Sequence, residues 1–195
     1  MSKAALLDRR VVVARLLRDR GETLVIAGLG SATYDLAAAG DDPRNFYLWG
    51  AMGGAAMMGL GLALAQPQRP VVVLTGDGEA LMGLGGFATI ALQKPKNLSV
   101  VILDNGLYGE TGAQATHTAG GADLAKIAMA CGIAETRTVT TMDEVGLLAE
   151  RITRIGEGPV VAVIKIDAGS PPRVLPSRDG AWLKGRFRHA LGLAV

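Results

Sequence analysis

Two near-continuous apolar runs constrain the fold of this chain more than any other feature. They are PVVVLT at residues 70–75 and LSVVILD at residues 98–104. Strands that are apolar on both faces are typical of parallel sheets covered by helices on each side. The segment between them, ALMGLGGFATIAL (80–92), is apolar almost all round and predicts a buried crossover helix. Together they predict a β-α-β unit of an α/β protein.

The same alternation extends along the whole chain. We expect further strands at residues 23–28, 46–49, 136–140 and 159–166. We expect helices at residues 3–20, at 31–40 with Ser31 as the cap, from Gly50 onward, and at 122–132, 141–156 and 181–193. This order predicts a doubly wound, mostly parallel sheet flanked by helices. Residues 1–195 are predicted to form a single domain, in which 170–195 are an extended segment and a closing helix.

Composition argues against several classes of protein. A chain of 195 residues that is 49% hydrophobic can bury one sizeable core. The net charge of +2, dispersed basic residues and an aromatic content of 4% argue against binding to nucleic acid. The single cysteine, Cys131, supports no disulfide framework or zinc site, and we interpret it as a small buried residue.

Membrane insertion and secretion are not expected either. The longest uncharged run, residues 46–68, is long enough for a short membrane span, but it contains five glycines between Gly50 and Gly61. A tightly packed helix of a soluble protein fits that composition better. The N-terminus, MSKAALLDRR, lacks the apolar region of a signal peptide, so a cytoplasmic location is expected.

Both apolar runs end in a polar residue flanked by glycine. Gly76-Asp77-Gly78 follows the first run, and Asp104-Asn105-Gly106 follows the second. Ligands of α/β sheets bind at the carboxyl ends of the strands, and adjacent strands lie about 4.8 Å apart. One carboxylate and one amide oxygen suit Mg²⁺ that also binds phosphate and water. With the helix N-termini expected after Gly78 and Gly30, the pattern predicts a magnesium-diphosphate site.

Two other interpretations of these turns are weaker. Each turn on its own is more often structural, but their occurrence at consecutive strand ends favours a site. A dinucleotide site is suggested by Gly28-Leu29-Gly30 after a strand, but its third glycine position is Thr33. The following strand also ends on Gly50 rather than on an acid for the ribose.

The spacing of the two turns resembles a known motif. GDG, 25 residues and then Asp-Asn is similar to the motif of thiamine diphosphate-dependent enzymes, which usually ends in Asn-Asn. The resemblance implies the diphosphate-binding domain of that fold, with Mg²⁺ bound by the side chains of Asp77 and Asn105. It also implies that Leu107 binds the metal through its backbone carbonyl.

A second segment resembles the same family. WGAMGGA (49–55) is similar to the segment that supports the cofactor in these enzymes. The resemblance implies that Met52 holds the two cofactor rings in a folded conformation and that the Gly50 carbonyl accepts a hydrogen bond from the 4'-amino group. The alternative is that Met52 is an ordinary core residue. Further cofactor contacts are implied at Gly30, Ser31, Gly76, Gly78 and Tyr108.

Within this family, the chain resembles the β subunits of sulfopyruvate decarboxylase and the C-terminal part of phosphonopyruvate decarboxylase. The likeness covers most of the chain from Gly28. It implies decarboxylation of a small 2-oxo acid by a hetero-oligomer. In that hetero-oligomer, an α-type subunit with the pyrimidine-binding domain supplies the activating glutamate. None of the glutamates of this chain lies in a segment that resembles that part of the family.

The segment after Asn105 contains further candidates. Thr111, Gly112, Gln114 and Thr116 are placed to contact the diphosphate or the substrate. His117 is a candidate catalytic residue because imidazole transfers protons near neutral pH. The alternative for His117 is a surface or loop-packing role.

Glu79 is the residue that fits this interpretation least well. A carboxylate about 5 Å from a phosphate charge costs roughly 3 kcal/mol at an effective dielectric constant of 20. We therefore expect the side chain to point away from the diphosphate, or the site to be weakened. The alternatives for the whole chain are a subunit of a 2-oxo acid oxidoreductase, a part of an acetolactate synthase-like enzyme, or a non-catalytic subunit.

Overall fold

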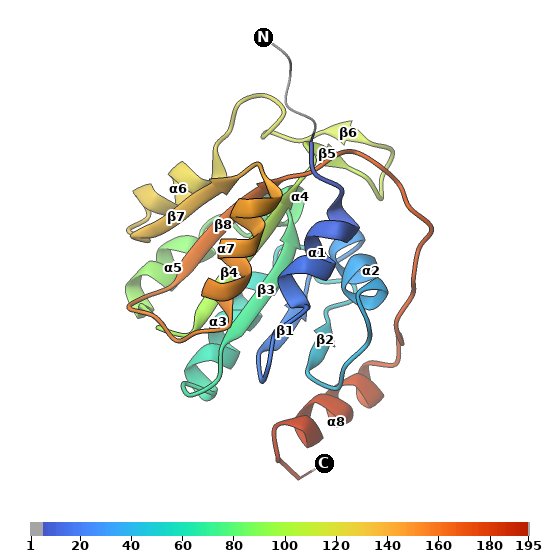
Figure 1. Ribbon diagram of the computed structural model, residues 1–195, viewed down its shortest axis with the longest axis vertical. Helices are drawn as coiled ribbons and strands as arrows, with labels where there is room; N and C mark the ends of the chain where they lie inside the picture. The colour runs from blue at the N-terminus through green and yellow to red at the C-terminus, as the bar shows by residue number, and fades with distance from the viewer. Residues whose placement is uncertain (1–5, 195) are drawn as a thin grey trace.

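A six-stranded sheet forms the centre of the protein (Figure 1). The computed structural model describes residues 6–194. The strands are β1 (Leu24–Ala27), β2 (Asn45–Tyr47), β3 (Val71–Gly76), β4 (Leu98–Asp104), β7 (Glu135–Val139) and β8 (Val160–Lys165). They pair in the order β2-β1-β3-β4-β8-β7, and every pairing is parallel. The predicted doubly wound α/β fold is confirmed.

Helices cover both faces of this sheet. One face packs against α1 (Arg9–Leu17), α2 (Ser31–Ala38) and α7 (Met142–Ile152). The other packs against α3 (Ala55–Ala65), α4 (Asp77–Met82), α5 (Gly86–Gln93) and α6 (Leu124–Ala130), while α8 (Gly180–Ala190) lies beside β2. In β3, Val72 and Leu74 join the first core and Val71 and Val73 the second, because successive strand residues point to opposite faces.

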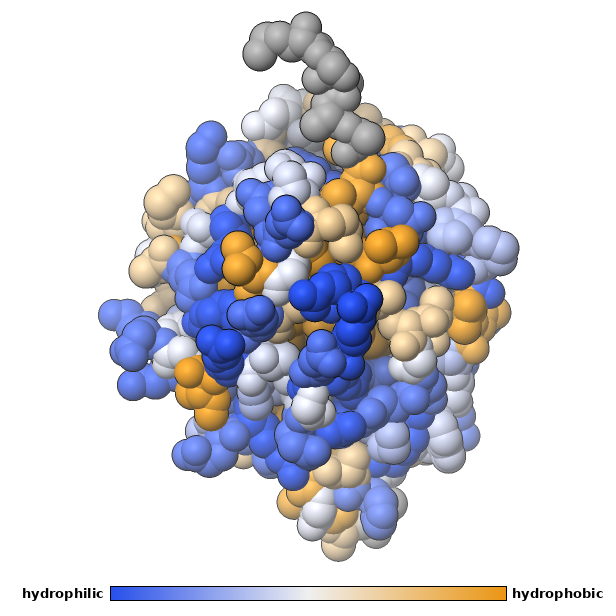
Figure 2. All heavy atoms as spheres, viewed as in Figure 1, coloured by the Kyte–Doolittle hydropathy of each residue, from blue (hydrophilic) through white to orange (hydrophobic). Residues whose placement is uncertain are grey.

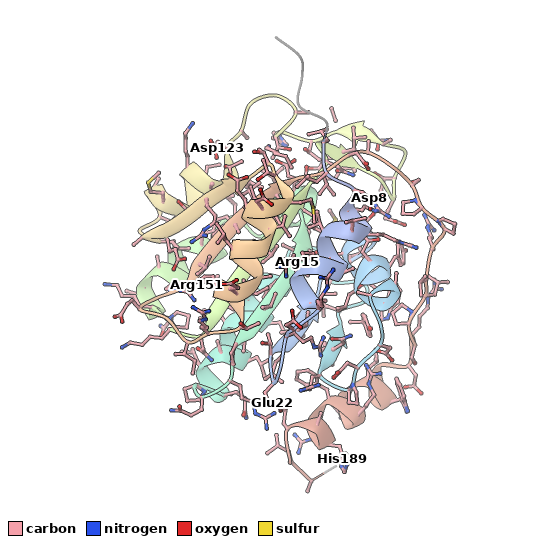
Figure 3. The ribbon with its side chains drawn as sticks, in the orientation of Figure 1. Asp8, Arg15, Glu22, Asp123, Arg151 and His189 are labelled. Carbon is pink, nitrogen blue, oxygen red and sulfur yellow. The ribbon has the colours of Figure 1, made fainter. Side chains whose placement is uncertain are left out.

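Short polar side chains determine where several helices begin. The Asp8 carboxylate accepts hydrogen bonds from the backbone amides of Arg10 and Val11, and Asp123 accepts one from Lys126. Figure 3 shows Asp8 and Asp123 at the starts of α1 and α6. Because Asp8 caps the helix, α1 is shorter than the predicted helix over residues 3–20, of which residues 3–5 lie outside the described part.

The two glycine-rich segments before α2 and α3 differ from the prediction. Gly30, with φ of +76°, is the N-cap of α2, and Ser31 is the first helical residue without a capping hydrogen bond. The predicted cap at Ser31 is therefore wrong. The helix predicted from Gly50 begins at Ala55, because Gly50 (φ +74°) and Gly53 (φ +91°) adopt left-handed conformations that favour glycine.

The predicted crossover helix over residues 80–92 is in fact two helices. It is broken at residues 83–85 between α4 and α5, and α4 begins earlier, at Asp77. A β-carbon on Gly83 would lie 2.4 Å from the carbonyl oxygen of Gly53. The break therefore lets the loop before α3 pack directly on the backbone at the end of α4.

A small antiparallel hairpin, β5 (Leu107–Tyr108) and β6 (Gln114–Ala115), was not predicted. It follows β4 and lies at the upper end of the sheet in Figure 1. The strand order of the sheet reverses between β1 and β3, because the chain goes from β1 out to β2 and returns to β3 on the other side of β1. Such a reversal opens a crevice at the carboxyl ends of the strands, where ligands of this class of fold bind.

The last part of the chain runs along the outside of the molecule (Figure 1). Residues 167–179 have no helix or strand, and the Trp49 indole N–H donates to the Ser177 carbonyl at 2.8 Å. Arg173 and Arg178 stack on Tyr34 and Trp49. The prediction of one domain over residues 1–195 stays a prediction.

The surface over α1 and α7 is largely hydrophilic, with apolar residues in separate patches (Figure 2). Within residues 6–194, no helix is both long and apolar enough to cross a membrane. The longest uncharged run contributes only the 11 residues of α3. Cys131 is half-buried at the end of α6 rather than fully buried, because it lies at the C-cap of the helix.

Candidate functional site

A pocket of about 340 Å³ lies at the carboxyl edge of the sheet, where the strand order reverses. We call it the strand-end pocket. Its lining includes eight predicted site residues: Ser31, Met52, Gly76, Asp77, Gly78, Asn105, Leu107 and Tyr108. Gly30 lies between the lining residues Leu29 and Ser31. Gly50 and His117 are exposed and are not among the lining residues, so their predicted roles find no support in this geometry.

Asp77 is the buried carboxylate of this pocket, with 2% of its surface exposed. Its Oδ2 atom accepts hydrogen bonds from the hydroxyls of Thr116 at 2.6 Å and Thr118 at 3.0 Å. Among residues 6–194, no hydroxyl donates a hydrogen bond to Oδ1. The two threonines therefore fix the carboxylate and leave one of its oxygens for a ligand.

A second buried carboxylate, Asp104, lies behind Asp77. It forms an ion pair with Lys165, and it accepts hydrogen bonds from Thr118 at 2.8 Å and from the Gly106 amide at 3.1 Å. The Thr118 hydroxyl thus lies within hydrogen-bonding distance of both Asp77 and Asp104, and its single hydrogen is donated to one of them at a time. Since Asp104 already has these partners, Asp77 is the carboxylate better placed to bind a cation.

The turn after β4 presents the other predicted metal ligands. The Asn105 side-chain oxygen accepts a hydrogen bond from the Leu107 amide at 2.9 Å. This turn brings Asn105 and Leu107 into the same pocket lining as Asp77. The structure therefore brings together the three residues for which metal binding was predicted.

Gly78 lets two side chains close over the segment after β3. A β-carbon on Gly78 would lie 2.5 Å from Cε1 of Tyr108 and 3.5 Å from Cε of Met52. Met52 is 38% exposed and lines the strand-end pocket, so it is not buried in the core. This excludes the alternative that Met52 is an ordinary core residue.

The turn between β1 and α2 is held by side chains on both sides. The Thr33 hydroxyl donates to the Gly28 carbonyl at 2.7 Å. Ser31 accepts a hydrogen bond from the buried Arg9 guanidinium at 2.7 Å. The first amides of α2, which have no carbonyl partner within the helix, therefore belong to a fixed turn. Arg9 behind this turn is also paired with the buried Asp35 at 3.1 Å.

Glu79 points into the protein, between the sheet and the loop before α3. It is 4% exposed, and Oε2 accepts hydrogen bonds from the Thr75 hydroxyl at 2.8 Å and the Leu29 amide at 3.1 Å. Burial raises the pKa of Glu79, while these hydrogen bonds and the nearby backbone amides of Ala55 and Gly53 oppose the rise. The expectation that Glu79 turns away from the ligand is consistent with this geometry.

The donor set fits a magnesium-diphosphate group. It combines one oxygen of the Asp77 carboxylate, the neutral oxygen of Asn105 and the backbone around Leu107, which are the hard oxygen ligands that Mg²⁺ prefers. A ligand can approach the backbone of Gly76 closely, because no other atom lies within 4 Å of the position of a β-carbon there, and the first turn of α2 suits an anion. These residues can therefore bind a cation and a phosphate group side by side.

The buried charge of Asp77 predicts a dependence of stability on pH. Burial raises the pKa of Asp77, hydrogen bonds from Thr116 and Thr118 oppose the rise, and the charge of Asp104 adds to it. A carboxyl with a raised pKa binds more protons in the folded than in the unfolded protein. It therefore lowers stability as the pH rises from the ordinary value of about 3.9 through the raised one.

We expect the ligand-free Asp77→Asn variant to be more stable than the wild type at neutral pH, by on the order of 1 kcal/mol. The gain should shrink towards pH 4, because the raised pKa of Asp77 increases the protonated fraction of the wild-type carboxyl as the pH falls. Urea unfolding of both proteins between about pH 4 and pH 7 measures it. A difference that stays constant over this range would contradict the prediction.

Sequence reasoning missed Thr118 and Lys165, and it gave Asp104 no role beyond its position in the motif. Thr116 and Thr118 lie 39 and 41 residues after Asp77. The β5–β6 hairpin, which directly precedes these threonines, was not predicted. Lys165 lies at the end of β8, which pairs with β4. The sequence shows only a lysine near the end of a predicted strand, because its position opposite Asp104 depends on the pairing of β4 with β8.

Comparison with known families identifies a match over most of this chain. Residues 28–166 match the family model described as "Thiamine pyrophosphate enzyme, C-terminal TPP binding domain". The chain is 40% identical over 182 residues to the sulfopyruvate decarboxylase subunit beta of Methanothermobacter thermautotrophicus. That alignment covers 93% of this chain and 94% of the relative.

Two longer proteins are also similar. Phosphonopyruvate decarboxylase of Streptomyces viridochromogenes is 37% identical over 193 residues, which cover 96% of this chain but 45% of that enzyme. The crystal structure of benzoylformate decarboxylase from Polynucleobacter necessarius superposes with a TM-score of 0.69 at 22% identity. It covers 88% of this chain and 36% of that chain, and it supports the fold alone.

Proposed function

Since the chain belongs to the thiamine pyrophosphate enzymes, through their C-terminal cofactor-binding domain, we propose that it is the cofactor-binding, β-type subunit of a 2-oxo acid decarboxylase. Sulfopyruvate is the proposed substrate. The observation that carries this proposal is the 40% identity to a sulfopyruvate decarboxylase β subunit over nearly the full length of both chains. Phosphonopyruvate is the second candidate, because the identity to phosphonopyruvate decarboxylase is only slightly lower.

The strand-end pocket supports specific roles for its residues. Asp77, Asn105 and the Leu107 carbonyl would hold Mg²⁺, and the α2 amides near Gly30 and Ser31 would hold the diphosphate. Met52 and Tyr108 would position the cofactor rings above Gly78. When bound, thiamine diphosphate supplies the electron sink for the loss of CO₂ from a 2-oxo acid.

A separate α-type subunit would supply the activating glutamate. Each acidic side chain in the pocket lining has a partner within this chain: Asp77 has Thr116, Glu79 has Thr75, and Glu110 has Arg173 at 3.2 Å. The relative's name, subunit beta, also implies another subunit.

Exposed apolar side chains beside the pocket suit such a partner. Met52, Met57, Met58 and Met82 are 38%, 39%, 37% and 62% exposed, and Met52 and Met82 line the pocket. Exposed apolar side chains that gather beside a pocket are typical of protein interfaces and ligand-binding grooves. A hetero-oligomer is therefore proposed, with the cytoplasm as its expected location.

The experiment compares the purified chain alone with its complex with the co-expressed α-type subunit. Both receive thiamine diphosphate and Mg²⁺, and CO₂ release is measured from sulfopyruvate, phosphonopyruvate and pyruvate. We expect the complex to be at least about 100-fold faster, the usual contribution of a positioned acid–base group, with sulfopyruvate preferred. Equal rates would contradict the divided site, and no CO₂ release from any of these acids would contradict the proposed function.

A further inference from the structure

The buried carboxylate of Glu79 directly follows the Gly76-Asp77-Gly78 turn, where a negative charge would repel a diphosphate. Its contacts instead join separate segments of the strand-end pocket. We infer that Glu79 is a positioning residue, which fixes the β1–α2 turn against the end of β3 and so prepares the pocket for the cofactor. This inference rests on the proposed cofactor-binding function.

The hydrogen bonds of Oε2 carry the argument. One comes from the hydroxyl of Thr75, which lies near the end of β3, four residues before Glu79. The other comes from the Leu29 amide, 50 residues away on the β1–α2 turn. Leu29 is therefore tied to β3 by a side chain, in addition to the pairing of β1 with β3. Hydrogen bonds to a charged acceptor are roughly twice as strong as neutral ones.

The same turn is fixed from its other side by Thr33, whose hydroxyl binds the Gly28 carbonyl. With Leu29 bound by Glu79, both polar groups of the peptide bond between Gly28 and Leu29 have partners, the carbonyl through Thr33 and the amide through Glu79. Because the Leu29 amide is used by Glu79, the amides that remain for a diphosphate are those of Gly30 and of the first residues of α2. Glu79 thus determines which amides face the ligand and where they lie.

The fit of the carboxylate depends on Gly28. A β-carbon on Gly28 would lie 1.7 Å from Oε2 of Glu79, which is far inside the sum of the van der Waals radii. Gly28 does not have a positive φ, so alanine can adopt its backbone conformation. The position therefore needs glycine because of the Glu79 carboxylate, and the two residues form one coupled contact.

Glu79 also lies beneath the loop that carries Met52. A small cavity of about 10 Å³ is lined by Glu79, Thr75, Gly53 and Gly83, among others. The other carboxylate oxygen, Oε1, is buried and has no hydrogen-bond partner among the described residues. Glu79 therefore joins two segments of the pocket by hydrogen bonds, the turn before Ser31 and the end of β3, and it borders the loop after Met52 across the small cavity.

The test measures the turn and the cofactor separately. Hydrogen exchange of residues 28–36 in the cofactor-free chain reports on the turn. Calorimetry with thiamine diphosphate and Mg²⁺ on the complex with the α-type subunit reports on binding. For Glu79→Ala we expect exchange at Leu29 to be at least about 10-fold faster and the cofactor Kd to rise about 10-fold, the usual effect of losing a charged hydrogen bond.

Three further variants make the result specific. Glu79→Gln should have an intermediate effect on exchange and Kd, because its amide oxygen can accept both hydrogen bonds but carries no charge. Gly28→Ala should resemble Glu79→Ala in an otherwise wild-type protein but have little further effect in the Glu79→Ala background. Glu150→Ala, on the exposed side of α7, is the matched control and should change neither measurement.

The possible outcomes separate this inference from the proposed function. Unchanged exchange and Kd in Glu79→Ala, or additive effects of Gly28→Ala and Glu79→Ala, would overturn the inference. Wild-type complex that binds no cofactor would overturn the proposed function, while faster exchange at Leu29 in Glu79→Ala would still support the fixed turn. If Glu79→Ala does not fold, Glu79→Gln and Gly28→Ala decide the question by the same measurements.

Discussion

Replacing Asp77 by asparagine is expected to abolish Mg²⁺-dependent binding of thiamine diphosphate, with a rise in Kd of at least about 100-fold. The substitution keeps the size of the side chain and removes its charge. Two unit charges 4 Å apart interact by about 4 kcal/mol at an effective dielectric constant of 20, which corresponds to more than 100-fold in affinity. Asn105 offers only a neutral oxygen, so it does not compensate for the loss.

Calorimetry of the complex with the α-type subunit measures this effect. Asp123→Asn is the matched control, because Asp123 caps α6 and is not among the residues that line the strand-end pocket. The cofactor-free Asp77→Asn variant is also expected to be more stable than the wild type, so lost binding together with gained stability would exclude misfolding as the cause. Unchanged affinity would remove Asp77 as a metal ligand.

The second large effect is expected from Gly83→Ala, at the break between α4 and α5. The new β-carbon would lie 2.4 Å from the Gly53 carbonyl oxygen, and that atom belongs to the backbone and has little freedom to move. The loop that carries Met52 would therefore have to shift. We expect a loss of about 1–3 kcal/mol in stability, typical of overpacking, and a cofactor Kd raised about 10-fold or more.

Gly85→Ala is the control for this substitution, because it lies two residues away in the same break. A β-carbon there meets no atom within 4 Å, and its φ of −60° is ordinary for alanine. Urea unfolding and calorimetry of both variants measure the difference between them. If Gly83→Ala binds the cofactor as well as Gly85→Ala does, the close packing of Gly83 on Gly53 has no role in the site.

Much of the candidate site was accessible from the sequence because it lies at strand ends. Asp77 and Asn105 follow two apolar runs, and parallel strands that are neighbours in the sheet must present their ends at the same edge. The resemblance to a known motif then identified Leu107 and Met52, which line the same pocket. These predictions needed only local patterns and the pairing of two strands.

The errors lie where glycine and tertiary packing decide the conformation. Ser31 has the composition of a helix cap, but Gly30 takes that position with a positive φ. The run over residues 80–92 is apolar like one helix, but the packing of Gly83 against Gly53 divides it. Local propensities are small, so close contacts between distant segments override them.

The sequence by itself determined the α/β fold, the strand ends that form the pocket and the family to which the chain belongs. These depend on hydrophobic periodicity and on short motifs, which are local properties of the chain. Only the tertiary structure decided where Glu79 points, and which hydroxyls hold Asp77. Glu79 meets Leu29 and Thr118 meets Asp77 across 50 and 41 residues, and the direction of a buried side chain depends on all the atoms around it.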